Sequence, residues 1–80
     1  FNPEIDLRGM ESIEAVATAE QFIDGAVMAK VSPLRIIHGK GTGALRTAIH
    51  QMLRKNKAVK SFRLGVFGEG ETGVTIVELK

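Results

Sequence analysis

The sequence predicts an α/β fold: one two-layer domain over residues 1–80, with two helices packed on a mixed four-stranded sheet in the order βαβαββ. Three observations support it. A chain of 80 residues and 8.7 kDa has room for one small domain. Short runs of alternating polar and apolar residues are interleaved with two longer runs of helical periodicity. The composition, 44% hydrophobic and 25% charged, is typical of a globular chain rather than a disordered one.

The first part of the chain predicts a strand followed by a long helix. Residues 4–8 alternate polar and apolar side chains, and Gly9 ends this strand. A helix then runs to about residue 30, with Glu11 or Ser12 as its cap. We expect its apolar face to consist of Ile13, Val16, Ala19, Ile23, Ala26 and Val27.

The rest of the chain predicts three more strands and one helix. Residues 34–37 form a strand parallel to the first, because crossover connections are right-handed. The next helix covers residues 44–55, and we expect His50 on its exposed surface. Residues 60–67 and 74–79 favour two antiparallel strands joined by a glycine-rich turn. The second helix has an apolar stripe of Leu45, Ala48, Ile49, Met52 and Leu53.

Several classes of protein are excluded by composition. The chain has no cysteine, which excludes disulfides, thiolate zinc sites and a cysteine nucleophile. No apolar run approaches the ~18 residues of a membrane span, and no signal peptide opens the chain. We therefore expect no membrane association. Because the first residue is Phe1, we expect a fragment of a larger protein.

Charge is distributed unevenly along the chain, although the net charge is only +2. Residues 1–24 carry a net charge of −5 and residues 69–80 carry −2. Residues 25–68 carry no acid and nine bases: Lys30, Arg35, Lys40, Arg46, Arg54, Lys55, Lys57, Lys60 and Arg63. Such a block favours a surface that binds a polyanion. The alternative is that these side chains form ordinary solvated helix faces.

The segment Gly39–Gly43, here called the glycine loop, joins the second strand to the second helix. Its alternate glycines allow backbone N–H groups to approach a ligand closely. The helix that follows adds free N–H groups and the positive end of its dipole. These features predict a phosphate site, against the alternative of a plain connection. The expected phosphate-binding residues are Gly39, Lys40, Gly41, Thr42, Gly43 and Arg46.

Two nucleotide-binding motifs fit this loop poorly. Residues 39–44 satisfy the loose dinucleotide pattern G-x-G-x-x-[GA], but no acidic residue follows before Glu69 to bind a ribose. The chain is also too short for a doubly wound sheet. The Walker A motif fails because Ala44 and Leu45 follow Gly43. The backbone of a nucleic acid is therefore the expected ligand.

Candidate catalytic residues lie at the ends of the first two strands. If these strands are parallel neighbours, Asp6, Arg8 and His38 meet at one edge, beside Lys40. His38 is suited to general acid or base chemistry, and Asp6 to orienting His38 or fixing Arg8. Arg8 and Lys40 could stabilise the charge that develops at phosphorus. We expect phosphodiester cleavage with no obligatory cofactor.

A divalent metal, Mg²⁺ or Mn²⁺, is the alternative to this metal-free chemistry. Two-metal nucleases need several carboxylates to converge. Here Asp6 stands alone unless the final turn brings Glu69 and Glu71 near it. The sequence therefore offers few ligands for such an ion.

Two motifs resemble the signatures of the Smr (small MutS-related) domain family: Ile5-Asp6-Leu7-Arg8-Gly9 and His38-Gly39-Lys40-Gly41-Thr42-Gly43-Ala44-Leu45-Arg46. The segments 60–63 and 73–79 are similar as well. The resemblance covers residues 5–80. The Arg form of the first motif is similar to the version at the C-terminus of a bacterial MutS paralogue that opposes recombination. Many stand-alone members have His where this chain has Arg8.

The resemblance implies a βαβαββ two-layer fold and an endonuclease that nicks DNA or cleaves messenger RNA at stalled ribosomes. It implies roles in suppressing recombination, in DNA repair or in ribosome quality control, and a location in the bacterial cytoplasm. The implied partners are branched or duplex DNA, RNA or the ribosome, and N-terminal MutS-like ATPase domains, with the isolated domain a monomer. Asp6, Arg8, His38, Gly39, Lys40, Gly41 and Gly43 match the motif positions, and Arg46 matches a basic position after them.

Two functions from different classes remain open at this point. The first is an endonuclease that contacts the nucleic-acid backbone with little sequence preference, since the four Phe are expected mostly in the core and no recognition helix is evident. The second is a non-catalytic module that docks a MutS-type ATPase onto nucleic acid or a ribosome. Both use the same basic residues, and only the first requires turnover and a specific role for His38.

Overall fold

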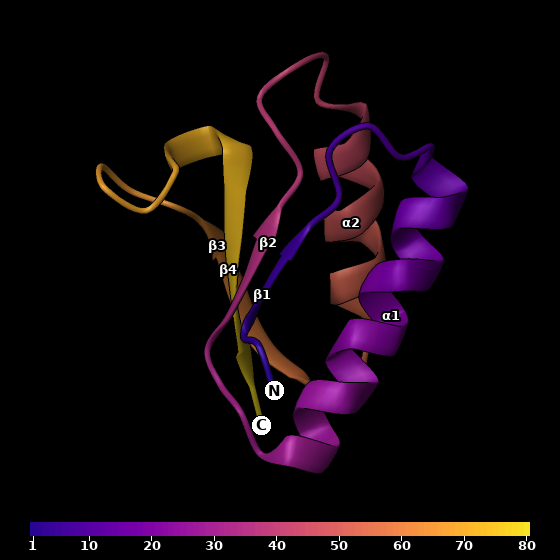
Figure 1. Cartoon of the computed structure of the whole chain (residues 1–80), viewed down its shortest axis with the longest axis vertical. Coiled ribbons are helices and arrows are strands. Elements are labelled where there is room, and N and C mark those ends of the chain that lie inside the picture. Colours follow the sequence, from indigo (N-terminus) through magenta and orange to yellow (C-terminus); the bar gives the residue numbers. More distant parts are fainter.

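The computed structural model describes residues 1–80 and has the predicted order of elements. Strand β1 is followed by helix α1, strand β2, helix α2 and strand β3 (Figure 1). A single 3-10 turn, η1, precedes the final strand β4. The bounds are β1 Glu4–Asp6, α1 Ser12–Ala29, β2 Leu34–Ile37, α2 Ala44–Lys55, β3 Val59–Leu64, η1 Glu71–Gly73 and β4 Val74–Leu79.

The four strands form one mixed sheet in the order β1-β2-β4-β3. Strands β1 and β2 are parallel, with Asp6 opposite Ile37. Strand β4 is antiparallel to both of its neighbours: Val74 lies opposite Ile37, and Leu64 lies opposite Thr75. The predicted parallel and antiparallel pairs are therefore confirmed. The ends of β1, β2 and β3 meet the start of β4 at one edge of the sheet, here called the rim.

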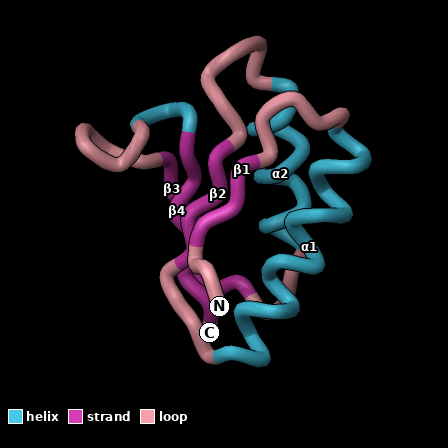
Figure 2. Tube along the Cα trace, viewed as in Figure 1, coloured by secondary structure: helices cyan, strands magenta, loops and turns pink.

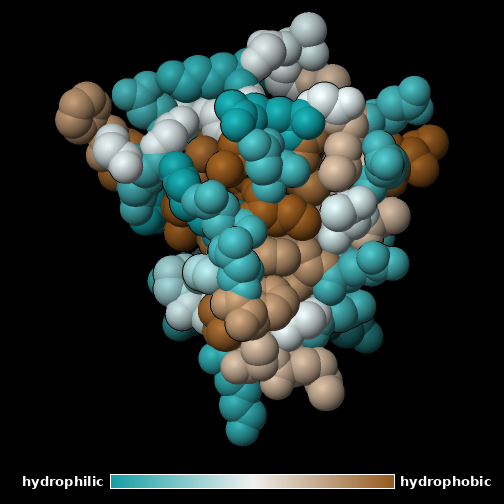
Figure 3. All heavy atoms as spheres, in the orientation of Figure 1, coloured by the Kyte–Doolittle hydropathy of each residue, from teal (hydrophilic) through white to brown (hydrophobic).

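Both helices cover the same face of the sheet, which makes the fold two layers (Figure 2). The core between the layers contains the inward residues of the strands and small residues of α1, and burial of this apolar surface drives folding. Hydrophilic atoms gather across the upper part of the face in Figure 3, with hydrophobic atoms showing in its middle. Neither helix combines the length and the apolar character that crossing a bilayer requires. The core consists of Leu7, Ala15, Ala19, Ile23, Ala26, Leu34, Ile36, Ile49, Met52, Leu53, Val59 and Val77.

The predicted apolar face of α1 is partly wrong. Ile13 is 87% exposed and Val27 is 44% exposed. The predicted Ala19, Ile23 and Ala26 do face the core, and Ala15, which was not predicted, joins them. Three of these four core-facing residues are alanines, whose small side chains suit close packing of a helix on a sheet. The expected side-chain cap is also missing, because Glu11 occupies the N-cap without a capping hydrogen bond.

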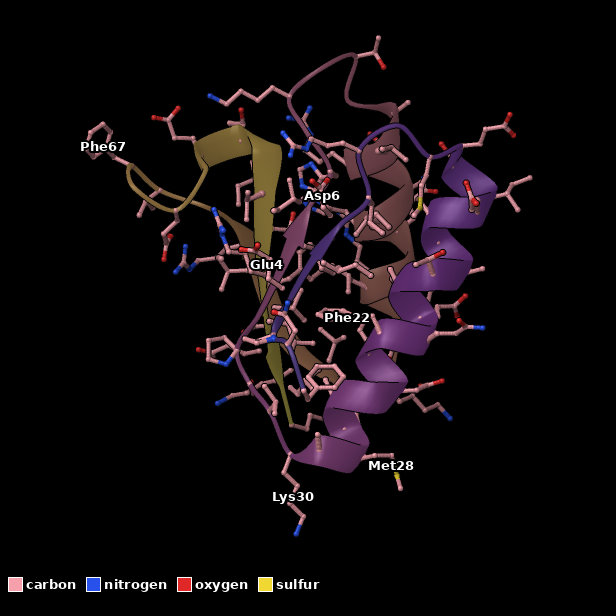
Figure 4. The ribbon with its side chains drawn as sticks, in the orientation of Figure 1. Glu4, Asp6, Phe22, Met28, Lys30 and Phe67 are labelled. Atoms are coloured by element: carbon pink, nitrogen blue, oxygen red, sulfur yellow. The ribbon has the colours of Figure 1, made fainter.

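The end of β3 and the placement of the Phe residues also differ from the prediction. Strand β3 ends at Leu64, and the chain then turns. The Glu69 carboxylate accepts hydrogen bonds from the Val66 N–H and from the Arg63 guanidinium, which holds that turn. Phe67 is 92% exposed and points away from the molecule (Figure 4). Since Phe1 is exposed as well, two of the four Phe residues lie outside the core.

Candidate functional site

The rim brings the predicted site residues together on two sides of the glycine loop. On the helix side lies a hollow of about 420 Å³, bounded by Ser12, His38, the glycine loop and Arg46. On the other side lies a hollow of about 470 Å³, bounded by Arg8, Arg35, Lys40 and Gly73. A larger groove of about 760 Å³ separates α1 from α2, but no histidine or arginine lines it. The two hollows at the rim therefore form the candidate site.

Asp6 fixes Arg8 and not His38. The Arg8 guanidinium donates from Nη2 to Asp6 Oδ2 at 2.7 Å and from Nε to Asp6 Oδ1 at 3.0 Å. The Arg8 backbone N–H donates to the same carboxylate at 3.0 Å. These hydrogen bonds lower the pKa of Asp6 to about 2, so the carboxyl is ionised near neutral pH. Figure 4 shows nitrogen atoms gathered beside Asp6 at the end of β1.

The glycine loop presents a row of free backbone donors. The N–H groups of Lys40, Gly41, Thr42 and Gly43 donate no hydrogen bond within the protein. Successive free N–H groups at the start of a helix form a binding site for anions. The Thr42 hydroxyl accepts a hydrogen bond from the Ala44 N–H at 3.3 Å, which leaves its own proton free to donate.

The glycines at the two ends of the loop are required by its backbone, and the central one is not. Gly39 and Gly43 have φ values of +85° and +84°, a region that L side chains rarely adopt. A Cβ at Gly43 would also lie 3.0 Å from Arg46 Nη2. Gly41 has no positive φ, and a Cβ there would meet nothing within 4 Å. The space above Gly41 is therefore open to a ligand.

Most cations at the rim are already paired with carboxylates. Lys40 Nζ lies 3.0 Å from Glu71 Oε2, and Arg63 Nη1 lies 2.7 Å from Glu69 Oε1. Arg35 binds Glu4 and the Glu69 carbonyl. The acid-free segment 25–68 is thus neutralised in part by acidic side chains from both ends of the chain. Its cations without an ion pair are Lys30, Arg46, Arg54, Lys55, Lys57 and Lys60, of which Arg46 borders the helix-side hollow.

His38 is buried behind the loop, with 4% of its surface exposed. Its Nδ1 lies 3.0 Å from the Gly39 carbonyl oxygen, and its Nε2 lies 2.8 Å from Thr75 Oγ1. Burial lowers the pKa of His38 below its ordinary value, the contact with the Gly39 carbonyl partly offsets this, and the nearby Arg46 charge lowers the pKa further. The imidazole therefore has both nitrogens engaged inside the protein and is neutral at pH 7.

The expected position of His50 on the exposed surface is wrong. Its ring is half-buried, and its Nε2 lies 2.7 Å from the same Thr75 hydroxyl that His38 binds. Its ring centroid is 4.8 Å from that of Phe62 and 6.0 Å from that of His38. Burial is the main cause of its lowered pKa, and His38, Arg54 and Arg46 lower it further. His50 is half-buried because it adjoins Ile49 and Leu53 on α2, and both of these residues face the core.

The carboxylates near the rim do not form a preassembled metal site. No group of three or more His, Cys, Asp or Glu side chains lies close enough to hold an ion. Asp6, Glu69 and Glu71 instead bind three different cations: Arg8, Arg63 and Lys40.

Two features of the site were not predicted from the sequence: Thr75, and the pairing of Glu71 with Lys40. Thr75 is fully buried, at a position of β4 that shares a face with Val77 and Leu79. A polar residue on the buried face of a strand is the signal that could have identified it, because its hydroxyl needs a buried partner. Glu71 gives no such signal, since its contact with Lys40 spans 31 positions of the sequence.

Comparison with protein families gives one match over nearly the whole chain. The sequence profile of the Smr domain matches residues 5–80. Among curated proteins, a protein named endonuclease MutS2 from Clostridium novyi is 59% identical over 76 residues, which is 95% of this chain. A protein of the same name from Ruminiclostridium cellulolyticum is 57% identical over 80 residues. The chain spans about a tenth of the length of either relative.

Two solved structures have the same fold. The Smr domain of Thermus thermophilus MutS2 superposes with a TM-score of 0.94 and is 48% identical, covering 96% of both chains. YdaL from Escherichia coli, a stand-alone small MutS-related protein, superposes with a TM-score of 0.92 over 98% of this chain and 64% of its own. Since YdaL is only 21% identical, its similarity concerns the fold alone.

Proposed function

Because the chain belongs to the Smr domain family, we propose that it binds the phosphodiester backbone of nucleic acid at the rim and nicks it. The observation that carries this proposal is the row of free N–H groups from Lys40 to Gly43. Of these residues, Gly41, Thr42 and Gly43 border the same hollow as Arg46. Backbone amides at the start of a helix suit a phosphate oxygen and do not read bases. Little sequence preference should follow.

In the proposed reaction, a water molecule attacks phosphorus and gives up one proton, the bond to the leaving nucleoside oxygen breaks, and that oxygen takes up one proton. Arg8 and Lys40 stabilise the added negative charge on the phosphoryl oxygens. Asp6 contributes by orienting Arg8, since a carboxyl with a pKa of about 2 is a weak base at neutral pH. Thr42, Gly39, Gly41, Gly43 and the side chain of Arg46 hold the phosphate.

His38 can serve this reaction in two ways, and a variant separates them. In one, it holds the Gly39 carbonyl and thereby the loop. In the other, it carries a proton, which requires a titratable ring. His38→Asn keeps an N–H donor near Nδ1 but cannot titrate. Cleavage that survives in His38→Asn assigns the first role, whereas lost cleavage with normal binding assigns the second.

The test of cleavage is a nicking assay on supercoiled plasmid, run beside a labelled single-stranded RNA, in EDTA and in Mg²⁺ or Mn²⁺. The variants are Lys40→Ala and its control Lys60→Ala, an exposed lysine at the start of β3, the opposite end of that strand from the rim. We expect Lys40→Ala to lose cleavage and Lys60→Ala to keep it. Absence of cleavage on either substrate would refute the nuclease proposal, and the EDTA lanes report the metal requirement.

A binding module without turnover is the second candidate. It is favoured by the burial of His38 and by the carboxylate partners of Arg8 and Lys40, which leave no free catalytic group facing the hollows. Binding of duplex and single strands at low salt, without cleavage, would support it. Either form should show a steep loss of affinity with added salt.

The wider setting is also a proposal. The relatives named endonuclease MutS2 are about ten times longer than this chain, which supports a domain attached to MutS-like ATPase domains in a bacterial protein. Suppression of recombination, DNA repair and ribosome quality control are the roles to test there. Branched DNA, duplex DNA and ribosome-bound RNA are the substrates to compare.

A further inference from the structure

We propose that His50 and Thr75 are positioning residues of the rim, which hold His38 in its Nδ1–H tautomer and thereby fix the base of the glycine loop. For its effect on activity this inference rests on the proposed function, but the tautomer itself can be measured without any substrate.

A continuous chain of three hydrogen bonds joins α2 to the glycine loop. His50 Nε2 lies 2.7 Å from Thr75 Oγ1, and Thr75 Oγ1 lies 2.8 Å from His38 Nε2. His38 Nδ1 then lies 3.0 Å from the carbonyl oxygen of Gly39. Every side chain in this path comes from a different element: α2, β4 and the end of β2.

The direction of each hydrogen bond follows from the one acceptor that cannot donate. The Gly39 carbonyl only accepts, so His38 Nδ1 must carry the proton. In a neutral ring His38 Nε2 is then a lone pair, and the Thr75 hydroxyl must donate to it. Because a hydroxyl has a single proton, Thr75 can only accept from the other ring. His50 must therefore carry its proton on Nε2.

Burial makes this arrangement hard to replace. Thr75 is fully buried, His38 is 4% exposed, and no buried side-chain nitrogen or oxygen lacks a partner. A buried polar atom that loses its partner is costly, since water cannot take the partner's place. The Gly39 carbonyl favours the alternative, a charged His38 donating from Nε2, but burial opposes it most and the positive charge of Arg46 opposes it further. A charge on His50 is opposed first by burial and then by nearby cations, Arg54 and Arg46.

The tautomer of His38 affects the glycine loop through hydrogen bonds to backbone carbonyl groups. The N–H groups of His38 and Gly39 both donate to the Gly73 carbonyl, at 3.1 and 2.9 Å. The Nδ1–H of His38 restrains the next carbonyl, that of Gly39. The other tautomer would turn a lone pair toward this carbonyl oxygen and push it away. The backbone that carries the free N–H groups after Gly39 would then lose this restraint.

The direct test is the ¹⁵N spectrum of the two histidine rings in the 80-residue chain at pH 8. We expect two distinct neutral tautomers, protonated on Nδ1 in His38 and on Nε2 in His50. The opposite tautomer in either ring, or rapid averaging of both, would overturn the proposal. This measurement involves no nucleic acid, so it is unaffected if the proposed nuclease activity is absent.

Variants then test whether Thr75 and His50 hold the tautomer or only accompany it. Thr75→Val removes the hydroxyl at nearly constant shape, Thr75→Ser restores it, and Thr47→Val changes an exposed threonine of α2 as the control. We expect averaged His38 tautomers in Thr75→Val only. If His38 stays fully Nδ1-protonated in Thr75→Val, the Gly39 carbonyl suffices and the positioning role is refuted.

His50 is tested by a matched pair of substitutions. His50→Gln keeps an N–H donor near the position of Nε2, whereas His50→Leu removes it. For a group that orients another one, we expect nicking to fall about tenfold in His50→Leu and to recover largely in His50→Gln. Equal losses in the two variants, with folding intact by circular dichroism, would contradict positioning by hydrogen bonding. If neither the unmodified chain nor a variant nicks DNA, the ¹⁵N spectra of the same variants show whether His50 holds the tautomer of His38.

Discussion

The Lys40 ammonium lies 3.0 Å from the Glu71 carboxylate, which joins the glycine loop to the short turn before β4. Both side chains are half exposed, at 61% and 50%. An exposed ion pair of this kind contributes about 0–1 kcal/mol and is easily exchanged. Under the proposed mode of binding, Glu71 occupies the place at Lys40 that a phosphate would take, so the two anions would compete for one cation.

This competition predicts that Glu71→Gln binds nucleic acid more tightly. Loss of the carboxylate frees Lys40 while keeping the size of the side chain. We expect Kd for a short duplex to fall by about two- to fivefold, the range that corresponds to an exposed pair worth up to ~1 kcal/mol. Fluorescence anisotropy at several salt concentrations measures it.

The control for this prediction is Glu20→Gln, which removes the same charge from an exposed position on α1. Equal tightening in the two variants would show that net charge alone acts. An unchanged Kd in Glu71→Gln would show that phosphate does not reach Lys40.

Gly41→Ala tests whether a ligand fills the open space above the loop. Since no atom lies within 4 Å of a Cβ at this position, we expect the free energy of unfolding to be unchanged or raised by about 0.5 kcal/mol. Binding should nevertheless weaken, because the new methyl group meets the phosphate. Urea denaturation and anisotropy measure the two effects separately.

Gly43→Ala provides the contrast. Because Gly43 has a positive φ and a Cβ there would crowd Arg46, we expect Gly43→Ala to lower the free energy of unfolding, even without a ligand. If Gly41→Ala binds as well as the unmodified chain, the phosphate lies elsewhere.

The histidine pair predicts a loss of stability in mild acid. The pKa of each ring is lowered in the folded state, mainly by burial, whereas in the unfolded chain it is about 6.5. The unfolded chain therefore binds more protons below that pH, so stability is full above pH 6.5 and declines as the pH falls through the folded values. Urea denaturation between pH 8 and pH 5 should show this decline, and His50→Gln should reduce it. A flat profile over that range would refute neutral buried histidines.

Asp6 predicts a separate transition in stronger acid. Hydrogen bonds from Arg8 lower its pKa to about 2 from the ordinary value of 3.8. A depressed carboxyl pKa stabilises the folded state above pH 3.8, and that contribution is lost between pH 3.8 and 2. The ¹³C resonance of the Asp6 carboxyl should titrate in that range. A midpoint near 4 would show that Arg8 does not hold Asp6 in solution.

Asp6→Asn connects this ion pair to activity. The substitution removes the negative charge beside Arg8, so nucleic acid should bind at least as tightly. The freed Arg8 loses its fixed orientation, and we expect nicking to fall about tenfold, as for a group whose contribution is positional. Asp24→Asn, on the exposed surface of α1, is the charge control. Unchanged nicking in Asp6→Asn would remove Asp6 from the site.

The sequence alone determined the order of the elements and the position of the glycine loop. Alternation and helical periodicity are local properties, so residues 34–37, 44–55 and 74–79 could be assigned without knowledge of the fold. The meeting of Asp6, Arg8 and His38 at one edge followed from a single topological rule, the right-handed crossover between parallel strands.

Only the tertiary structure decided which partner each of these side chains has. Asp6 had two candidate partners and binds Arg8, while His38 binds Thr75, a residue 37 positions away. Glu71 reaches Lys40 over a similar separation. Such contacts depend on strand order and on the depth of burial, which periodicity does not encode. For that reason the location of the rim could be read from the chain, whereas the hydrogen-bond network that supports it could not.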